Sequence, residues 1–252
     1  MARTIVISGA ASGIGKATAD LSRAAGDVVI GVDLANADIN ADLGTPEGRA
    51  KMIAEVHAQA PDGIDGLLAG AGISRTDSIS VAVNYFGAIA TLDGLRPLLA
   101  KSASPRAVAI CSTAGFLQGN DAVVEACLTG IEATARAQCD AAPTSAYLDS
   151  KKALSLWLRK TAVAPEWAGS GILLNGVGPG VVLTPMSMPL FDDPDMVEAI
   201  RGSNPIAVKN YAQPGELAEV IRFLLTFENH YLLGQVIFVD GGTDALLRPT
   251  TF

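Results

Sequence analysis

The chain alternates short apolar runs with longer stretches in which apolar residues recur every three or four positions. The short runs are rich in β-branched residues, which is typical of strands buried on both faces of a parallel sheet. Alternation of this kind predicts an α/β fold, a doubly wound parallel sheet with right-handed crossovers and helices on both faces. The predicted strands span residues 4–8, 27–32, 64–69, 106–111, 171–177 and 235–239, with a short one near 38–39.

The first predicted strand leads into a glycine-rich turn. Gly9, Gly13 and Gly15 follow it, and residues 16–25 then have a helix-forming composition that ends at Gly26. A strand, a glycine turn and a helix together bring backbone N–H groups and the positive end of the helix dipole against a pyrophosphate. The spacing is G-x-x-x-G-x-G and differs from the general dinucleotide fingerprint G-x-G-x-x-G. Its place between strand and helix predicts a Rossmann-like dinucleotide site.

The second predicted strand ends next to an acidic residue, Asp33, which lies 18 residues after Gly15. A carboxylate in this place accepts hydrogen bonds from the hydroxyls of the adenosine ribose and repels a 2′-phosphate. Residues 34–38 contain no lysine or arginine that would pair with such a phosphate. The pattern therefore predicts NAD as the cofactor and disfavours NADP. The alternative is a surface aspartate that caps a turn.

Tyr147 and Lys151 stand four residues apart, so on a helix both side chains lie on one face. A phenol is a poor acid or base at neutral pH, and a nearby cation lowers its pKa. A shift of about 3 units requires roughly 4 kcal/mol of differential stabilisation. Such a pair taken alone is more often an accidental surface pair. Beside the glycine turn and Asp33, it predicts an acid/base site.

Together these residues resemble the short-chain dehydrogenase/reductase family, and the similarity runs from Ser8 to Gly242. Within the family, the chain is most similar to the bacterial 3α-hydroxysteroid dehydrogenase/carbonyl reductase branch. The similarity to this branch includes Ala41-Asp42-Leu43, residues 83–87 and the tail from Val239 to Phe252.

The resemblance implies a catalytic tetrad. Tyr147 would be the general acid or base, and Lys151 would lower its pKa and hold the nicotinamide ribose. Ser112 would hold the substrate oxygen, and Asn84 would hold a water that links Lys151 to solvent. Ser112 is preferred among the serines because it follows the strand at 106–111 in the family pattern Ser-x-Ala-Gly. The implied cofactor-binding residues are Gly9, Ser12, Gly13, Ile14, Gly15, Asp33, Leu34, Asp42, Leu43, Ala69, Gly70, Ala71, Pro179, Gly180, Val182 and Thr184, with Tyr147 and Lys151.

Three features depart from the family pattern. Gly70-Ala71-Gly72 stands where the family usually has Asn-Ala-Gly, and the stretch from Gly72 to Asn84 leaves little room for a helix. Ser112 lies 35 residues before Tyr147, a separation that predicts a helical insert at about 116–145. None of the three removes a catalytic group.

The insert contains an apolar stripe at helical spacing. We expect the stripe to be buried, either on its own subunit or against a neighbour. In the first case it would cover the surface that family members often use for tetramers, which favours a homodimer, with a homotetramer as the alternative. The stripe comprises Val123, Val124, Cys127, Leu128 and Ile131.

Residues 184–210 are rich in methionine and other apolar residues and carry four prolines. Prolines interrupt regular structure, and thioethers adapt to varied shapes. Because the segment follows Pro179-Gly180, we interpret it as a mobile lid over an apolar substrate. The alternative is a loop and helix that only pack on the core.

Length, charge and cysteine content limit the domains, partners and metal sites that we expect for this chain. The 252 residues suit one NAD-binding domain over 1–252, and a net charge of −8 disfavours nucleic acid and anionic membranes. No signal-peptide core or apolar span is apparent, so we expect a cytoplasmic protein. Cys111, Cys127 and Cys139 lack metal-ligand spacing, and we expect no metal site. His57 falls in a predicted helix at 46–60, where we expect a surface histidine.

The function favoured is an NAD-dependent oxidoreductase that interconverts a bulky apolar secondary alcohol and its ketone, with a 3α-hydroxysteroid-type substrate first. A dehydrogenase of monoterpenoid or other alicyclic alcohols, or a general carbonyl reductase, is the alternative. A non-catalytic nucleotide-responsive binding protein is the rival from another class. The complete set of Ser112, Tyr147, Lys151 and Asn84 argues against that rival.

Overall fold

The computed structural model, which describes residues 2–141 and 145–251, contains one seven-stranded parallel sheet. The strand order is β3-β2-β1-β4-β5-β6-β7, so the predicted doubly wound fold is confirmed. Each predicted strand is present, with boundaries that differ by at most two residues. The strands are β1 (Thr4–Ser8), β2 (Val28–Asp33), β3 (Ile39–Asn40), β4 (Gly66–Ala69), β5 (Arg106–Ile110), β6 (Leu173–Pro179) and β7 (Val236–Val239).

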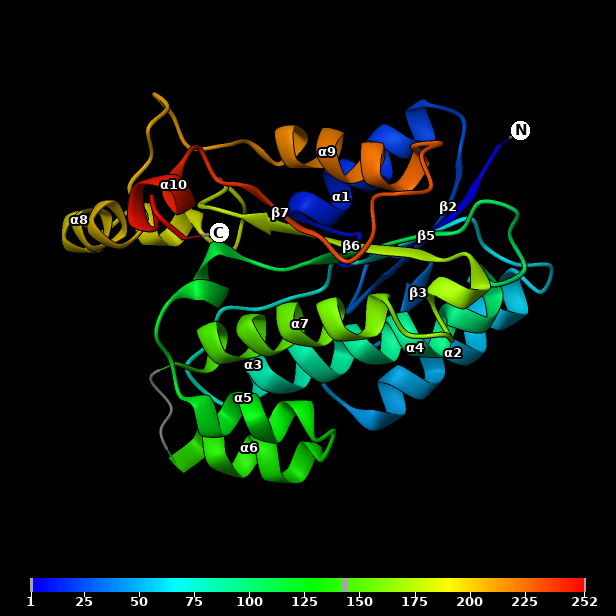
Figure 1. Cartoon of the computed structure of the whole chain (residues 1–252), viewed down its shortest axis with the longest axis horizontal. Helices are drawn as coiled ribbons and strands as arrows, with labels where there is room; N and C mark the ends of the chain where they lie inside the picture. The colour runs from blue at the N-terminus through cyan, green and yellow to red at the C-terminus, as the bar shows by residue number, and fades with distance from the viewer. Residues whose placement is uncertain (1, 142–144, 252) are drawn as a thin grey trace.

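Helices cover both faces of the sheet (Figure 1). Helices α1 (Gly13–Ala24) and α9 (Pro214–Thr226) pack together on one face, and α2 (Pro46–Gln59), α4 (Ala88–Leu99) and α7 (Ala146–Ala162) lie on the other.

Successive residues of β1 serve opposite faces, which explains the unbroken apolar runs. Ile5 and Ile7 pack with Ile221 of α9, whereas Val6 belongs to the core that includes Leu92 of α4 and Leu154 of α7.

The region before Asn84 holds only a short helix, as the sequence predicts. Helix α3 spans Ile79–Val81 and continues into a π-helical segment, η1 (Ala82–Gly87), which runs directly into α4. Asn84 thus lies on a π-helical turn, a feature that often occurs at functional sites.

The insert forms two helices, α5 (Asp121–Leu128) and α6 (Glu132–Ala141), on the side of α7 that faces away from the sheet (Figure 1). Residues 142–144 of the insert lie outside the described residues. Val123, Val124 and Cys127 are buried.

Leu128 and Ile131 are exposed on the single subunit, so burial of these two residues against a neighbouring subunit stays a prediction. Helix α5 ends at Leu128, and Gly130 has a positive φ of 78°. Because the helix ends at Leu128, the three- and four-residue spacing no longer places Leu128 and Ile131 on the buried face of α5.

Shorter elements complete the chain. The structure describes η2 (Thr113–Phe116), η4 (Ala168–Ser170), η5 (Met188–Phe191), α8 (Pro194–Ser203) and α10 (Thr243–Leu247). Among residues 2–141 and 145–251, no helix has the length and apolar character needed to cross a membrane.

Candidate active site

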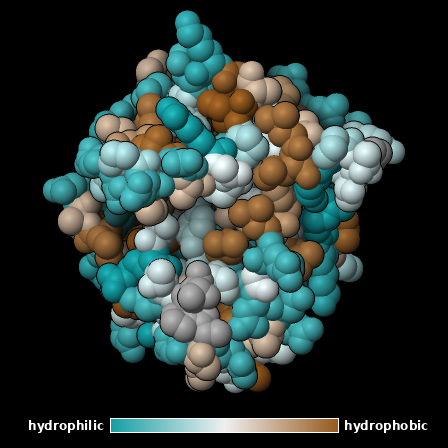
Figure 2. Space-filling view, turned by 90° about the vertical axis from the view of Figure 1, so that its left-hand side faces the viewer, coloured by the Kyte–Doolittle hydropathy of each residue, from teal (hydrophilic) through white to brown (hydrophobic). Residues whose placement is uncertain are grey.

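A cavity of about 590 Å³ lies at the carboxyl ends of the strands. It spans the point where the strand order reverses between β1 and β4, the usual ligand position in open α/β sheets. Figure 2 shows the face that carries α8, with apolar side chains gathered across its middle.

The glycine turn forms one wall of this cavity. Gly9 and Gly13 have positive φ values of 77° and 52°, a conformation that favours glycine. A Cβ on Gly15 would lie 2.1 Å from the carbonyl oxygen of Gly9, so only glycine lets α1 begin so close to the turn. The first turn of α1 contains no acidic side chain. This wall therefore fits a pyrophosphate.

Asp33 stands at the tip of β2, on the cavity wall. Its carboxylate accepts hydrogen bonds from the backbone N–H groups of Ala11, at 2.9 Å, and Leu34, at 2.7 Å. These two bonds hold the carboxylate at the edge of the glycine turn. Asp42 and Leu43 line the cavity beside it, because β3 pairs with β2 and places Asn40 opposite Asp33.

Ser112, Tyr147 and Lys151 line the other end of the cavity. Ser112 follows β5, and its Oγ accepts a hydrogen bond from the N–H of Ala114 at 3.1 Å. Lys151 is buried and donates from Nζ to the carbonyl oxygen of Ile110 at 2.7 Å. Its Nζ lies 6.0 Å from the centre of the Tyr147 ring. The fold thus brings together three of the four predicted catalytic side chains on the cavity wall.

Burial dominates the acid/base properties of this pair. It raises the pKa of Tyr147, and the Ser112 hydroxyl acts in the opposite direction. Burial lowers the pKa of Lys151 to about 8, and the Cys111 thiol raises it. In the chain alone burial has the largest effect on the pKa of Tyr147, so the expectation that Lys151 lowers this pKa stays a prediction for the enzyme with its cofactor bound.

Asn84 lies behind the cavity wall and is fully buried. Its Oδ1 accepts from the N–H of Ile73 at 2.8 Å, and its Nδ2 donates to the carbonyl oxygen of Ile73 and to Ser150. A Cβ on Gly72 would be 3.2 Å from this Oδ1 and 3.5 Å from Nζ of Lys151. Asn84 is therefore close to Lys151 but does not line the cavity.

Of the predicted cofactor-binding residues, all but Ala69 line the cavity. Ala69 is the last residue of β4, and its side chain belongs to the core that also contains Leu67, two residues earlier. Strand alternation sends both to the same buried face.

Gly70 has no room for the asparagine that the family usually has at this position. A Cβ there would lie 2.7 Å from the carbonyl oxygen of Ser8. The N–H groups of Gly70 and Ala71 both donate to Oγ of Ser8, at 3.1 and 3.3 Å. The Ser8 hydroxyl therefore connects the end of β1 to the loop after β4 through two hydrogen bonds.

Sequence analysis assigned no role to several residues of the wall, which come from separate loops and helices. Their position within or beside recognised segments, such as Ala41 before Asp42 and Leu148 after Tyr147, was the available signal. The missed residues are Ala41, Gly72, Ile73, Ser74, Val83, Ile110, Cys111, Thr113, Ala114, Leu117, Leu148 and Val181.

His57 is partly exposed on α2, as expected of a surface histidine, and its Nε2 lies 3.4 Å from the carbonyl oxygen of Gly94.

Comparisons with known proteins agree with this geometry. Residues 9–244 match a family model described as enoyl-(acyl carrier protein) reductase. The chain is 40% identical over 257 residues to the 3-alpha-hydroxysteroid dehydrogenase/carbonyl reductase of Comamonas testosteroni, covering 98% of this chain and 99% of that protein. The chain belongs to the short-chain dehydrogenase/reductase family.

A solved relative in this family has a closely similar structure. The 3-alpha-hydroxysteroid dehydrogenase from Pseudomonas sp. B-0831, complexed with NADH, superposes with a TM-score of 0.93 at 42% identity. The comparison covers 99% of this chain and all of that one. A cyclopentanol dehydrogenase of Comamonas sp. strain NCIMB 9872 is 36% identical over 101 residues, about 40% of each chain.

The protein is therefore a short-chain dehydrogenase/reductase enzyme, an oxidoreductase that acts on hydroxyl groups with a nicotinamide cofactor. When bound, the nicotinamide ring accepts or supplies the hydride. The glycine turn fits the phosphates of such a cofactor.

Replacing Lys151 by Met should stabilise this dehydrogenase/reductase while impairing catalysis. The pKa of Lys151 is about 8, below its ordinary 10.5, so below pH 8 folding bears the cost of a buried charge. Between these values the unfolded chain holds a proton that the folded chain has lost, so this group's contribution to stability rises with pH. The variant should gain up to about 3 kcal/mol of unfolding free energy near pH 7.

Denaturant unfolding of wild type and Lys151→Met at pH 7 and at pH 10.5 checks this. The difference should nearly vanish at the higher pH. A variant that is less stable than wild type at pH 7 would show that the hydrogen bond to Ile110 outweighs the burial cost.

Proposed function

We propose that this enzyme is an NAD-dependent dehydrogenase/reductase that interconverts a bulky, mostly apolar secondary alcohol and its ketone. The observation that carries the proposal is the apolar part of the cavity wall. The apolar side chains that line the cavity together with Tyr147 and Ser112 include Leu117, Leu148, Met186, Leu190 and Ile200. Among the described residues of the wall, Lys151 is the only cation, so a phosphorylated substrate would find no other charge partner.

Tyr147 is proposed as the proton-transfer group. In the oxidation direction it takes the proton from the substrate hydroxyl, and in the reduction direction it returns that proton to the carbonyl oxygen. Ser112 donates a hydrogen bond to the same oxygen, where negative charge develops in the transition state. Lys151 holds the nicotinamide ribose, and its ammonium favours the ionised phenol. Asn84 is proposed to orient a water beside Lys151, in keeping with its nearby buried amide.

The segment at 184–210 is proposed as the substrate lid. Met186, Leu190 and Ile200 of this segment line the cavity, and Met186, Met188 and Met196 are also exposed. Apolar side chains in contact with solvent next to an active site suit a cover that closes on an apolar substrate.

A 3α-hydroxysteroid-type substrate is proposed first, and the full-length similarity to steroid-acting relatives supports it. Monoterpenoid or other alicyclic alcohols are the second candidate, and the partial similarity to a cyclopentanol dehydrogenase supports them. NAD-linked oxidation measured across 3α-hydroxysteroids, monoterpenols, cyclopentanol, sugars and phosphorylated alcohols tests the proposal. A preference for a sugar or a phosphorylated alcohol over every alicyclic alcohol would refute it.

Asp33 should make the enzyme strongly prefer NAD. Its carboxylate offers two oxygens to ribose hydroxyls and repels a 2′-phosphate. In Asp33→Ala, kcat/KM with NAD should fall roughly 10- to 100-fold, because hydrogen bonds to a charged group are lost. The kcat/KM with NADP should change much less, so the ratio of kcat/KM for NAD to that for NADP should fall. Asp62→Ala, which removes an exposed carboxylate, is the matched control. Equal wild-type kcat/KM for NAD and NADP would contradict the assignment.

Assembly as a homodimer is proposed, with the insert excluding the tetramer. Helix α5 packs against α7, the helix that family members often use for subunit contacts. Light scattering on the wild type and on a variant in which a short turn replaces residues 118–141 tests this. A tetrameric wild type whose mass the replacement leaves unchanged would show that the insert does not govern assembly.

A further inference from the structure

Helix α6 of the insert is linked through Arg49 of α2 to the end of the cavity that lies far from Tyr147. Asp33 on β2 and Asp42 after β3 stand at this end, whereas Ser112 follows β5. Three strand spacings separate β2 from β5 in the sheet, or roughly 14 Å. A dinucleotide with its nicotinamide beside Ser112 and its phosphates on the glycine turn would place its adenosine against Asp33, Asp42 and Leu43.

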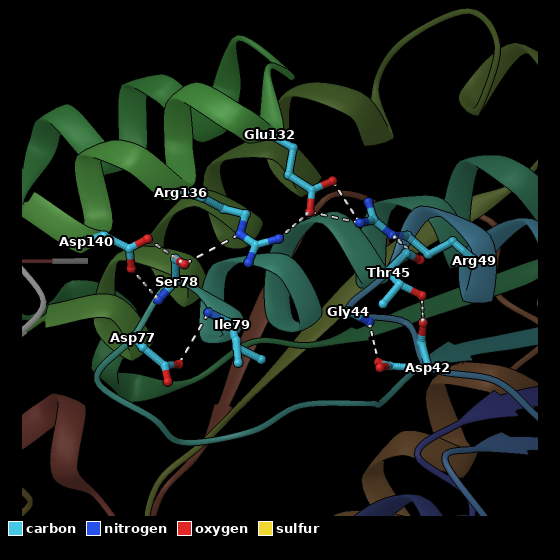
Figure 3. Close-up of polar contacts among 10 residues, drawn as sticks. All are labelled: Asp42, Gly44, Thr45, Arg49, Asp77, Ser78, Ile79, Glu132, Arg136 and Asp140. Carbon is cyan, nitrogen blue, oxygen red and sulfur yellow. Dashed lines mark hydrogen bonds and ion pairs between the residues drawn. The ribbon is translucent and has the colours of Figure 1, made fainter.

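The link between α6 and this end begins with an ion pair (Figure 3). Nη2 of Arg49, in α2, lies 2.8 and 2.7 Å from the two carboxylate oxygens of Glu132, the first residue of α6. The exposed fractions of the two side chains are 11% and 22%. The positive N-terminal end of α6 also favours the Glu132 carboxylate. A pair so shielded from water holds its geometry better than an exposed one.

Arg49 also forms a hydrogen bond to the turn at residues 42–45, which lies at the adenosine end of the cavity. Its Nε donates to the carbonyl oxygen of Thr45 at 3.1 Å. Thr45 Oγ1 donates in turn to the carbonyl oxygen of Asp42 at 3.0 Å, and the N–H of Gly44 donates to Oδ1 of Asp42 at 2.9 Å. The turn at 42–45 is thus connected through Arg49 to the insert.

The other end of α6 is also held (Figure 3). Asp140 accepts from the N–H and the hydroxyl of Ser78, at 3.1 and 3.0 Å. Arg136 lies between the two contacts, with Nε 3.4 Å from Oγ of Ser78 and Nη1 3.9 Å from Glu132. Because both ends of α6 are anchored, Glu132 is a fixed support for Arg49.

We propose that Glu132, acting through Arg49, is a positioning residue for the adenosine end of the cofactor site, so that the insert sets cofactor affinity. The inference rests on the proposed binding of NAD. Without the carboxylate, Arg49 is left as a shielded cation that has lost its Glu132 ion-pair partner, and it turns toward solvent. Its Nε then leaves the carbonyl oxygen of Thr45, and the turn at 42–45 keeps its own hydrogen bonds but becomes more mobile.

Calorimetric titration of NADH and of ADP-ribose, which has the adenosine half but no nicotinamide, tests the proposal. In Glu132→Gln, the Kd for both ligands should rise by the same factor, roughly 3- to 30-fold. The kcat at saturating NAD should remain close to wild type, since Tyr147 and Ser112 lie at the other end. Glu125→Gln, which removes an exposed charge from α5 of the same insert, should leave both Kd values unchanged.

Two further variants separate the steps of the argument. Arg49→Lys keeps the positive charge but has no Nε to donate to Thr45, so it should weaken both ligands as Glu132→Gln does. The double variant Glu132→Gln/Arg49→Lys should bind both ligands no more weakly than the single variant with the higher Kd. The reason is that both substitutions break the same link from Glu132 through Arg49 to Thr45. A loss of folded protein would lower the number of binding sites in the titration and leave their affinity unchanged.

An unchanged Kd for NADH in Glu132→Gln would overturn the inference, as would a rise for NADH with none for ADP-ribose. If the proposal that the enzyme binds NAD is wrong, the result differs, because the wild type would then bind neither NADH nor ADP-ribose.

Discussion

Replacing Tyr147 by Phe should lower kcat by about 10²- to 10⁴-fold, the usual contribution of a positioned acid or base. The phenyl ring keeps the packing of the half-buried tyrosine on α7, and Lys151 is unaffected. NADH affinity should therefore stay close to that of the wild type. Steady-state kinetics with an alicyclic alcohol, together with titration of NADH, measure the two quantities separately.

Tyr231→Phe is the matched control, because Tyr231 is 88% exposed and loses the same hydroxyl group. Its kcat should equal that of the wild type. If Tyr147→Phe kept more than a few per cent of wild-type kcat, Tyr147 would not be the acid/base group. A wild type that binds NADH but oxidises no alcohol would instead support the rival function of a nucleotide-responsive binding protein.

Replacing Ser112 by Ala should lower kcat by roughly 10²- to 10³-fold, as expected for one donor to a developing oxyanion. Oγ of Ser112 already accepts a hydrogen bond from the N–H of Ala114. That bond does not use the O–H of Ser112, which can turn to donate to the substrate oxygen. Kinetics at saturating NAD and substrate check the result, because the loss should fall on kcat more than on KM.

The Ser112 side chain also caps η2, and loss of a cap costs about 0.5–2 kcal/mol of stability. A thermal melt of Ser112→Ala therefore accompanies the kinetics. Ser170→Ala, at an exposed serine, is the control for the loss of a hydroxyl group. An undiminished kcat in folded Ser112→Ala would exclude Ser112 as the group that binds the substrate oxygen.

The strands could be predicted from the sequence because burial on both faces demands continuous apolar runs. Helix α1 extends three residues further toward the N-terminus than the predicted start at residue 16. The reason is that Gly13 and Gly15 stand in the first turn of α1, although glycine is a poor helix former in isolation. Contact between α1 and the turn decides this, since Gly15 packs directly on the backbone of Gly9.

Most of the candidate site could also be predicted. The glycine turn, Asp33, Tyr147 and Lys151 follow from local patterns because each stands at the end of a strand or on one helix face, whereas Ser112 was implied by the resemblance to the family. Asn84 was found by resemblance, but its place behind the wall depends on hydrogen bonds to Ile73 and Ser150. No local pattern could indicate that Ala69 points into the core while Gly70 and Ala71 line the cavity.

The sequence by itself determined the α/β fold, the strand positions and the nucleotide-binding end, because these depend on periodicity and on residues close together in the chain. Only the tertiary structure decided what depends on burial and on distant contacts. Desolvation lowers the pKa of Lys151 to about 8 and raises that of Tyr147. Arg49 and Glu132, 83 residues apart, meet only because α6 folds back toward α2. Dielectric environment and long-range pairing arise from packing, and packing exists only once the chain has folded.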